Sequence, residues 1–148
     1  HPVKELIWTG SDSTTLQGGG KTLLPVGEHN GDTYQIKLNG HDRFAARDYR
    51  YFTRTQVWQH HSGTGGLDSH LDEGGAGGAA AAFNNSIAVY SFALKPEEHQ
   101  PSGTCNFSRI DNAQLVVSGS SSSALTVFAV NYNVLRIMSG MGGLAYSN

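Results

Sequence analysis

Residues 33–40 read TYQIKLNG, and this stretch decides the fold class. Every second residue from Tyr34 to Leu38 is apolar, so an extended chain here has one apolar and one polar face. The dipeptide Asn39-Gly40 follows, and it is favoured in two-residue turns between paired strands. The stretch therefore predicts a half-buried strand that ends at Leu38 in a tight turn.

Other short strands are predicted on both sides of this one. They cover residues 3–8, 52–60, 87–94, 113–117 and 124–138. The last is long enough for a helix, but its threonine, valine and internal asparagine residues favour a strand. Polar, glycine-rich residues predict loops or a tail over residues 11–20, 62–85, 95–111 and 139–148. Short strands separated by turn signals, without a convincing amphipathic helix, predict an all-β sandwich or barrel.

Composition limits the function classes. The 148 residues fit one domain, and 10 basic against 12 acidic residues give a net charge of −2. No strongly basic field is available to hold nucleic acid. The single cysteine, Cys105, excludes an internal disulfide, and no apolar run approaches the roughly 20 residues that span a bilayer.

The sequence also lacks a constellation for catalysis or metal binding. His60 and His61 are adjacent on a predicted strand, so their side chains would leave opposite faces and could not share one ion. Glu97 and Glu98 are adjacent in a loop, which is not the opposed pair of a glycosidase. No G-x-S-x-G elbow is present. We therefore expect no catalytic residue, no cofactor and no metal, and the chain is not predicted to be an enzyme.

The most specific stretch is residues 90–112, YSFALKPEEHQPSGTCNFSRIDN. It resembles a signature of the major capsid proteins of nucleocytoplasmic large DNA viruses. The resemblance continues in residues 131–148, NYNVLRIMSGMGGLAYSN, in residues 1–8, HPVKELIW, and in residues 36–44, IKLNGHDRF. Together these stretches cover about two fifths of the chain in the order of the family.

The resemblance implies an eight-stranded antiparallel jelly-roll sandwich, one half of a double jelly roll. Residues 1–148 would be the C-terminal jelly-roll domain, with a long Gly/Ala-rich loop near residues 62–85. The implied function is structural: trimeric, pseudo-hexagonal capsomers of an icosahedral capsid. The implied partners are a companion N-terminal jelly roll, neighbouring capsomers and minor capsid proteins, without direct contact to nucleic acid and without a transmembrane segment. The implied location is the virion, assembled in the host cytoplasm.

The resemblance assigns structural roles to a set of signature residues. They are Asn39, Gly40, Arg43, Pro96, Glu97, Glu98, Gly103, Asn106, Arg109, Asp111, Asn131, Tyr132, Arg136 and Gly140. Two N-x-S sites, at Asn84 and Asn106, fit the N-glycosylation pattern. We expect Asn84 to be the better acceptor, because it lies beside the Gly/Ala-rich loop.

One alternative from another class stays open on the sequence. A carbohydrate-binding jelly-roll module would need exposed aromatic side chains on a concave sheet face or a loop tip. Trp8, Trp58 and Tyr49 are the serviceable candidates. A glycan array without hits would discriminate against this alternative.

Overall fold

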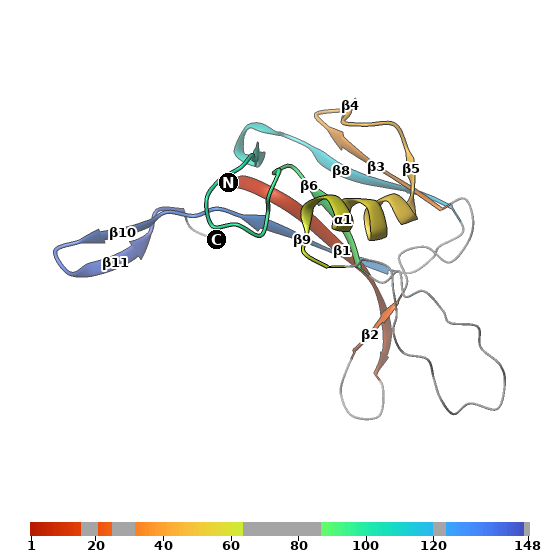
Figure 1. Cartoon of the computed structure of the whole chain (residues 1–148), viewed down its shortest axis with the longest axis horizontal. Coiled ribbons are helices and arrows are strands. Elements are labelled where there is room, and N and C mark those ends of the chain that lie inside the picture. Colours follow the sequence, from red (N-terminus) through yellow and green to blue (C-terminus); the bar gives the residue numbers. More distant parts are fainter. Residues whose placement is uncertain (16–20, 25–31, 64–86, 120–123, 147–148) are drawn as a thin grey trace.

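The computed structural model describes residues 1–15, 21–24, 32–63, 87–119 and 124–146 (Figure 1). The strands are β1 (Pro2–Thr15), β2 (Lys21–Leu24), β3 (Thr33–Leu38), β4 (His41–Asp42), β5 (Arg47–Asp48), β6 (Ile87–Ser91), β7 (Cys105–Asn106), β8 (Ala113–Ser118), β9 (Ala124–Asn131), β10 (Leu135–Met138) and β11 (Met141–Leu144). The helical segments are η1 (Tyr51–Thr55), α1 (Gln56–His60) and η2 (Phe107–Arg109). Every strand pairing in this part of the chain is antiparallel, which confirms the all-β class.

The long strand β1 organises the first sheet. Strand β9 pairs along one side of it and β6 along the other, while β2 and β7 pair with its two ends. Residues 11–15, expected in a loop, extend β1 instead. Ser11 and Thr15 pair with β2, and Ser11 also pairs with β9. Such ladder hydrogen bonds are made by the backbone and do not need apolar side chains.

Strand β3 is the centre of the second sheet, with β8 on one side and the short β4 and β5 on the other. It occupies the residues that the alternation predicts. Asn39 (φ 51°) and Gly40 (φ 79°) then form the turn into β4. Both lie in the left-handed region that a tight hairpin turn needs, and asparagine and glycine are the residues that tolerate it best.

The core lies between the two sheets and is built on aromatic side chains. Trp8 from β1, Tyr34 from β3 and Phe52 from η1 are all 0% exposed. Their ring centroids lie 5.2–6.0 Å apart, within the range of favourable edge and tilted contacts. Burial, together with the nearby charge of Asp32, raises the pKa of the Tyr34 phenol to about 12.

Residues 52–60 are helical, so the strand prediction for them is wrong. Phe52, Thr53 and Gln56 are buried, whereas Thr55 and Trp58 are exposed. This spacing puts one helical face inward, against β6 (Figure 1). In an extended chain, Phe52 and Gln56 would point to one face and Thr53 to the opposite face, so a single face could not bury all three.

The C-terminal segment also departs from expectation. The apolar run 124–138 is broken after Asn131, so β9 and β10 are separate strands. The predicted tail folds back as β11, and Ser139 (φ 51°) and Gly140 (φ 77°) make a second tight turn. The strands predicted over residues 3–8, 87–94 and 113–117 are confirmed, although β6 ends at Ser91.

Most of the Gly/Ala-rich loop near residues 62–85 lies outside the described residues. In the part of the chain that is described, no helix is long and apolar enough to cross a membrane.

Candidate functional site

The candidate site begins with the signature corner, residues 92–112, which folds back onto the start of β1. The Lys4 ammonium donates to the Pro96 carbonyl at 2.7 Å. The Lys4 carbonyl in turn accepts the backbone N–H groups of Phe92 (2.9 Å) and Ala93 (3.2 Å). Pro96 is buried. The corner is therefore tied to β1 by both the backbone and the side chain of one residue.

Glu97 connects the signature corner to the end of α1. Its Oε1 accepts hydrogen bonds from the Ser62 backbone N–H (3.0 Å), the Ser62 hydroxyl (3.2 Å) and His61 Nδ1 (3.1 Å). These contacts hold the pKa of Glu97 below its usual range, with the Ser62 backbone N–H as the largest cause. The neighbouring Glu98 instead pairs with Lys95 at 3.1 Å on the surface.

The two adjacent histidines have separate partners. His60 ends α1 and its Nδ1 lies 3.1 Å from the Leu94 carbonyl oxygen. His61 follows the helix, and its Nε2 lies 2.9 Å from Glu5 Oε2 on β1. Because the segment is helical, the prediction that the two side chains leave opposite faces of a strand is wrong. Within the described ranges, no group of three or more His, Cys, Asp or Glu could hold a metal ion.

Asn39 fastens the other end of the corner. Its side-chain oxygen accepts the backbone N–H groups of Asp111 (2.9 Å) and Asn112 (3.3 Å). Its own backbone N–H donates to the Asn112 carbonyl at 2.8 Å. The turn that contains Gly40 is thereby joined to the entry into β8. The backbone of Asp111, rather than its carboxylate, makes this contact.

Gly103 and Asn106 shape the middle of the corner. A Cβ on Gly103 would lie 2.8 Å from the Phe92 carbonyl oxygen, and its φ of 142° is strained for other residues. The Asn106 side chain accepts the Ser108 backbone N–H at 3.1 Å and begins η2. Asn106 is exposed, whereas Asn84 lies outside the described residues, so the preference between the two glycosylation sites stays a prediction.

We expect Gly103→Ala to lower the free energy of unfolding by ~1–3 kcal/mol, because it combines a strained φ with a backbone clash. Chemical unfolding of the wild type and the variant measures this. Gly143→Ala is a suitable control, since a Cβ there meets nothing within 4 Å. Equal losses of stability in the two variants would contradict the conclusion that the backbone at position 103 requires glycine.

The remaining signature residues lie at the ends of the sheets or on the surface. Asn131, the last residue of β9, pairs with Val3, and the Tyr132 backbone N–H donates to the Pro2 carbonyl at 3.0 Å. The Lys4 ammonium lies 5.3 Å from the centroid of the Tyr132 ring.

Three signature arginines are exposed. They are Arg43, Arg109 on η2 and Arg136 on β10.

Burial raises the pKa of Tyr90, and the nearby Arg43 opposes this shift. Burial likewise raises the pKa of the Cys105 thiol, which disfavours a thiolate nucleophile.

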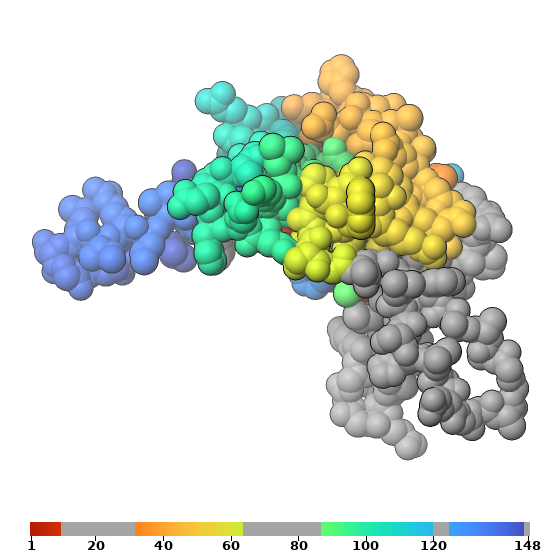
Figure 2. Space-filling view, viewed as in Figure 1, coloured from red at the N-terminus to blue at the C-terminus, as the bar shows by residue number. Residues whose placement is uncertain are grey.

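The hairpin β10–β11 projects from the body of the molecule and forms a separate lobe in the space-filling view (Figures 1 and 2). Its pairing register puts Leu135, Ile137 and Leu144 on one face. Met138 and Met141 share the other face. These five side chains are between 56% and 74% exposed. We call these five residues the apolar hairpin surface.

Asn133 is a residue that the sequence reasoning missed. Its side-chain oxygen accepts the backbone N–H groups of Val134 (2.8 Å) and Tyr146 (3.1 Å), and its amide donates to the Tyr146 carbonyl at 3.0 Å. Asn133 therefore closes the base of the hairpin. A signal was available, because Ser139-Gly140 between two apolar runs marks a two-residue turn.

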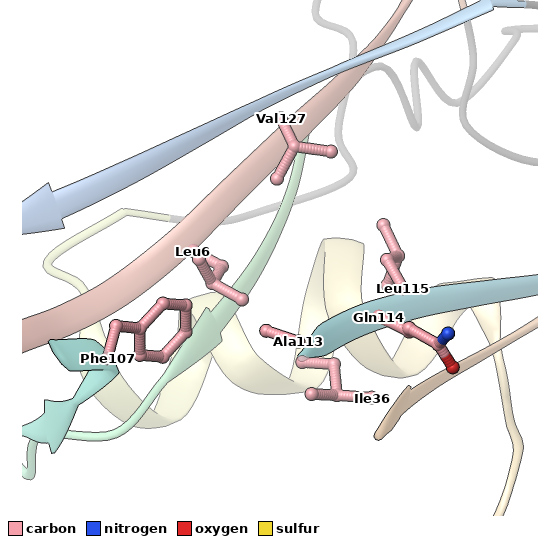
Figure 3. A pocket seen from close by; sticks show the side chains of 7 residues that line it. All are labelled: Leu6, Ile36, Phe107, Ala113, Gln114, Leu115 and Val127. Carbon is pink, nitrogen blue, oxygen red and sulfur yellow. The ribbon is translucent and has the colours of Figure 1, made fainter. Parts of the chain in front are cut away.

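A cavity of about 220 Å³ lies between the two sheets (Figure 3). Leu6 on β1, Ile36 on β3 and Leu115 on β8 are among its apolar lining residues. Gln114 is the one polar side chain in the lining, and no lining residue is titratable. The cavity therefore offers no group for acid, base or nucleophilic catalysis.

The aromatic candidates for carbohydrate binding are not available together. Trp8 is 0% and Tyr49 is 8% exposed, so both belong to the core. Trp58 is 77% exposed and stands on α1. A sugar platform built from the three side chains is therefore excluded, because Trp8 and Tyr49 are buried.

An antiparallel sandwich whose polar signature residues bind its own corners belongs to the jelly-roll class of β-proteins. Comparison with solved structures supports this class: a quasi-atomic model of the PBCV-1 virus capsid matches with a TM-score of 0.64 and 33% identity, covering 100% of this chain and 44% of that chain. A second match, PBCV-1 VP54 fitted into a reconstruction of the virophage Sputnik, has a TM-score of 0.65 and 34% identity.

Sequence comparison gives the family. The profile described as "Large eukaryotic DNA virus major capsid protein" matches residues 79–143. The major capsid protein of Pyramimonas orientalis virus is 50% identical, over 100% of this chain and 37% of that protein. The major capsid protein of Paramecium bursaria Chlorella virus 1 is 42% identical, over 79% of this chain and 28% of that protein. The chain belongs to the major capsid proteins of large eukaryotic DNA viruses, and it spans well under half the length of these relatives.

Proposed function

We propose that the protein is a structural component of an icosahedral capsid, located in the virion. The observation that carries this proposal is the 50% identity to a viral major capsid protein along the whole chain. The local roles of the polar signature residues agree with it, since a shell subunit needs a rigid sandwich rather than a reactive pocket. These relatives are structural proteins, and the proposed role requires neither catalysis nor a cofactor.

The proposed assembly is a homotrimer with a pseudo-hexagonal outline. In it, residues 1–148 form the C-terminal jelly roll of a subunit and pack against a companion N-terminal jelly roll. Three subunits with two similar sandwiches each present six similar lobes, which tile a hexagonal lattice. The span of 44% of the matched capsid chain is consistent with one of two such lobes.

The proposed contacts to the companion jelly roll, neighbouring capsomers and minor capsid proteins are supported by exposed apolar surface. The apolar hairpin surface adds to the exposed Val127 (47%) and Phe128 (55%) of β9. Exposed apolar side chains that gather on one element, as on the hairpin, mark interaction sites in soluble proteins. The net charge of −2 offers no basic field for nucleic acid, so no direct contact with nucleic acid is part of the proposal. The proposed site of assembly is the host cytoplasm.

Light scattering and electron microscopy of the full-length polypeptide test the proposal. We expect a particle of three times the subunit mass with a hexagonal outline. A stable monomer that does not associate at high concentration would overturn the capsomer assignment.

A further inference from the structure

Three segments that are distant in the sequence meet at the ring of His61. Its Nε2 lies 2.9 Å from Glu5 Oε2 on β1, and its Nδ1 lies 3.1 Å from Glu97 Oε1 in the signature corner. The side chains are unequally exposed, at 7% for Glu5, 19% for His61 and 46% for Glu97. One imidazole therefore bridges a buried and a half-exposed carboxylate.

The chemistry of the three groups requires a proton that a neutral histidine does not have. An ionised carboxylate only accepts hydrogen bonds, and a neutral imidazole has one N–H and one lone pair. Both contacts of His61 are hydrogen bonds between a ring and two carboxylates only when both ring nitrogens carry protons. Loss of one proton leaves a nitrogen lone pair facing a carboxylate oxygen, and two such acceptors repel each other.

The other charged or titratable side chains near His61 contact other partners, so Glu5 and Glu97 are the two that face its ring. On β1, the neighbouring Lys4 is directed to the Pro96 carbonyl and the Tyr132 ring. In the signature corner, Lys95 and Glu98 pair with each other. On α1 itself, His60 contacts the Leu94 carbonyl.

The strand β6 packs against α1, and the β6 groups that contact this helix are neutral. The Ser91 backbone N–H donates to Gln56 Oε1 at 3.1 Å, and the Ser91 hydroxyl donates to the Ala93 carbonyl at 2.6 Å. No compensating cation therefore replaces the ring proton among the described residues packed against His61.

We propose that Glu5, His61 and Glu97 form a proton-operated latch. In the protonated form the latch joins the end of α1 to β1 and to the signature corner. When His61 loses its proton, the Glu97 contact weakens and the corner separates from the end of α1. This makes the cohesion of the fold depend on pH, a property that the proposed capsid role does not contain.

The sign of the dependence follows from proton counts. The closed latch, as proposed, carries one more proton than the open form, so rising pH favours the open form. On the acid side, the pKa of Glu97 is lower in the folded state than in the unfolded state. The contribution of Glu97 to stability is therefore present above its unfolded-state pKa and is lost as pH falls through its folded-state pKa. The latch is therefore closed over an intermediate range of pH and opens on both sides of it.

Mass spectrometry of hydrogen exchange in the assembled full-length protein tests the latch. Exchange of the His61 ring C2 hydrogen reports the protonation of the ring, and exchange of the Ser62 amide reports its bond to Glu97. We expect Ser62 protection, corrected for the intrinsic effect of pH, to fall about tenfold over the same pH range in which His61 loses its proton. Protection that stays constant across that range would overturn the proposal.

Two variants separate the latch from a general effect of pH. His61→Gln should remove the alkaline loss of Ser62 protection, whereas the matched control His60→Gln, which loses a single contact to a backbone carbonyl, should retain it. If His61→Gln does not fold, Glu97→Gln serves instead. It replaces one facing carboxylate by an amide that can donate as well as accept a hydrogen bond, so the alkaline loss of Ser62 protection should shrink. A loss as large as in the wild type contradicts the latch.

Discussion

Trp8→Ala is expected to lower the free energy of unfolding by ~3–5 kcal/mol, the cost of deleting a large aromatic side chain from a packed core. Trp8 is 0% exposed, and its ring lies 5.5 Å from Tyr34 and 5.2 Å from Phe52 between centroids. It is therefore the point at which β1, β3 and η1 meet. Against a total stability of roughly 5–15 kcal/mol for a domain, this loss threatens folding itself.

Urea unfolding followed by far-ultraviolet circular dichroism measures the change. Trp58→Ala is the matched control, because the same residue type is 77% exposed there. The control should change stability by no more than about 0.5 kcal/mol. Similar losses in the two variants would show that Trp8 is not central to the core.

Replacing Leu135 and Ile137 together by aspartate is expected to weaken subunit association about 30-fold or more, equivalent to ~2 kcal/mol. Both side chains lie on the same face of the hairpin and are 65% and 68% exposed. Within the described part of the chain, β10 and β11 make substantial contacts only with each other. Charges at these positions should therefore spare the sandwich while disrupting the proposed capsomer contact.

Sedimentation of the full-length polypeptide over a range of concentrations measures this association. Arg136→Gln, on the opposite face of the same strand, is the control and should associate like the wild type. An unchanged assembly in the double variant would exclude the face of the hairpin that carries Leu135 and Ile137 from the contact. Such a result would leave the capsid assignment itself intact.

The strongest local patterns of the sequence predict what the structure contains. The alternation from Tyr34 to Leu38 and the turn at Asn39-Gly40 both depend on neighbours in the chain, and both are confirmed. The helical residues 52–60 were misread because their threonines and aromatics have strand propensity. Packing of Phe52 and Gln56 into the core overrode that weak preference.

The candidate site was predicted only in part. The resemblance points to Glu97 as a signature residue, but its contacts with His61 and Ser62 join positions 35 or 36 residues apart. The sequence places His61 on a strand and separates it from both carboxylates. No local pattern encodes such a contact, because it arises only when β1, α1 and the signature corner pack together.

By itself, the sequence predicted the all-β class and the family, and both are confirmed; the structural roles of the signature residues stay a prediction from resemblance. Alternation, turn dipeptides and long stretches of similarity are properties of neighbouring residues, so they can be recognised without a structure. Only the tertiary structure decided that Trp8 and Tyr49 are buried, that His61 lies between Glu5 and Glu97, and that the apolar hairpin surface is exposed. Burial and long-range hydrogen bonds depend on which segments pack together, and that is set by the whole chain at once.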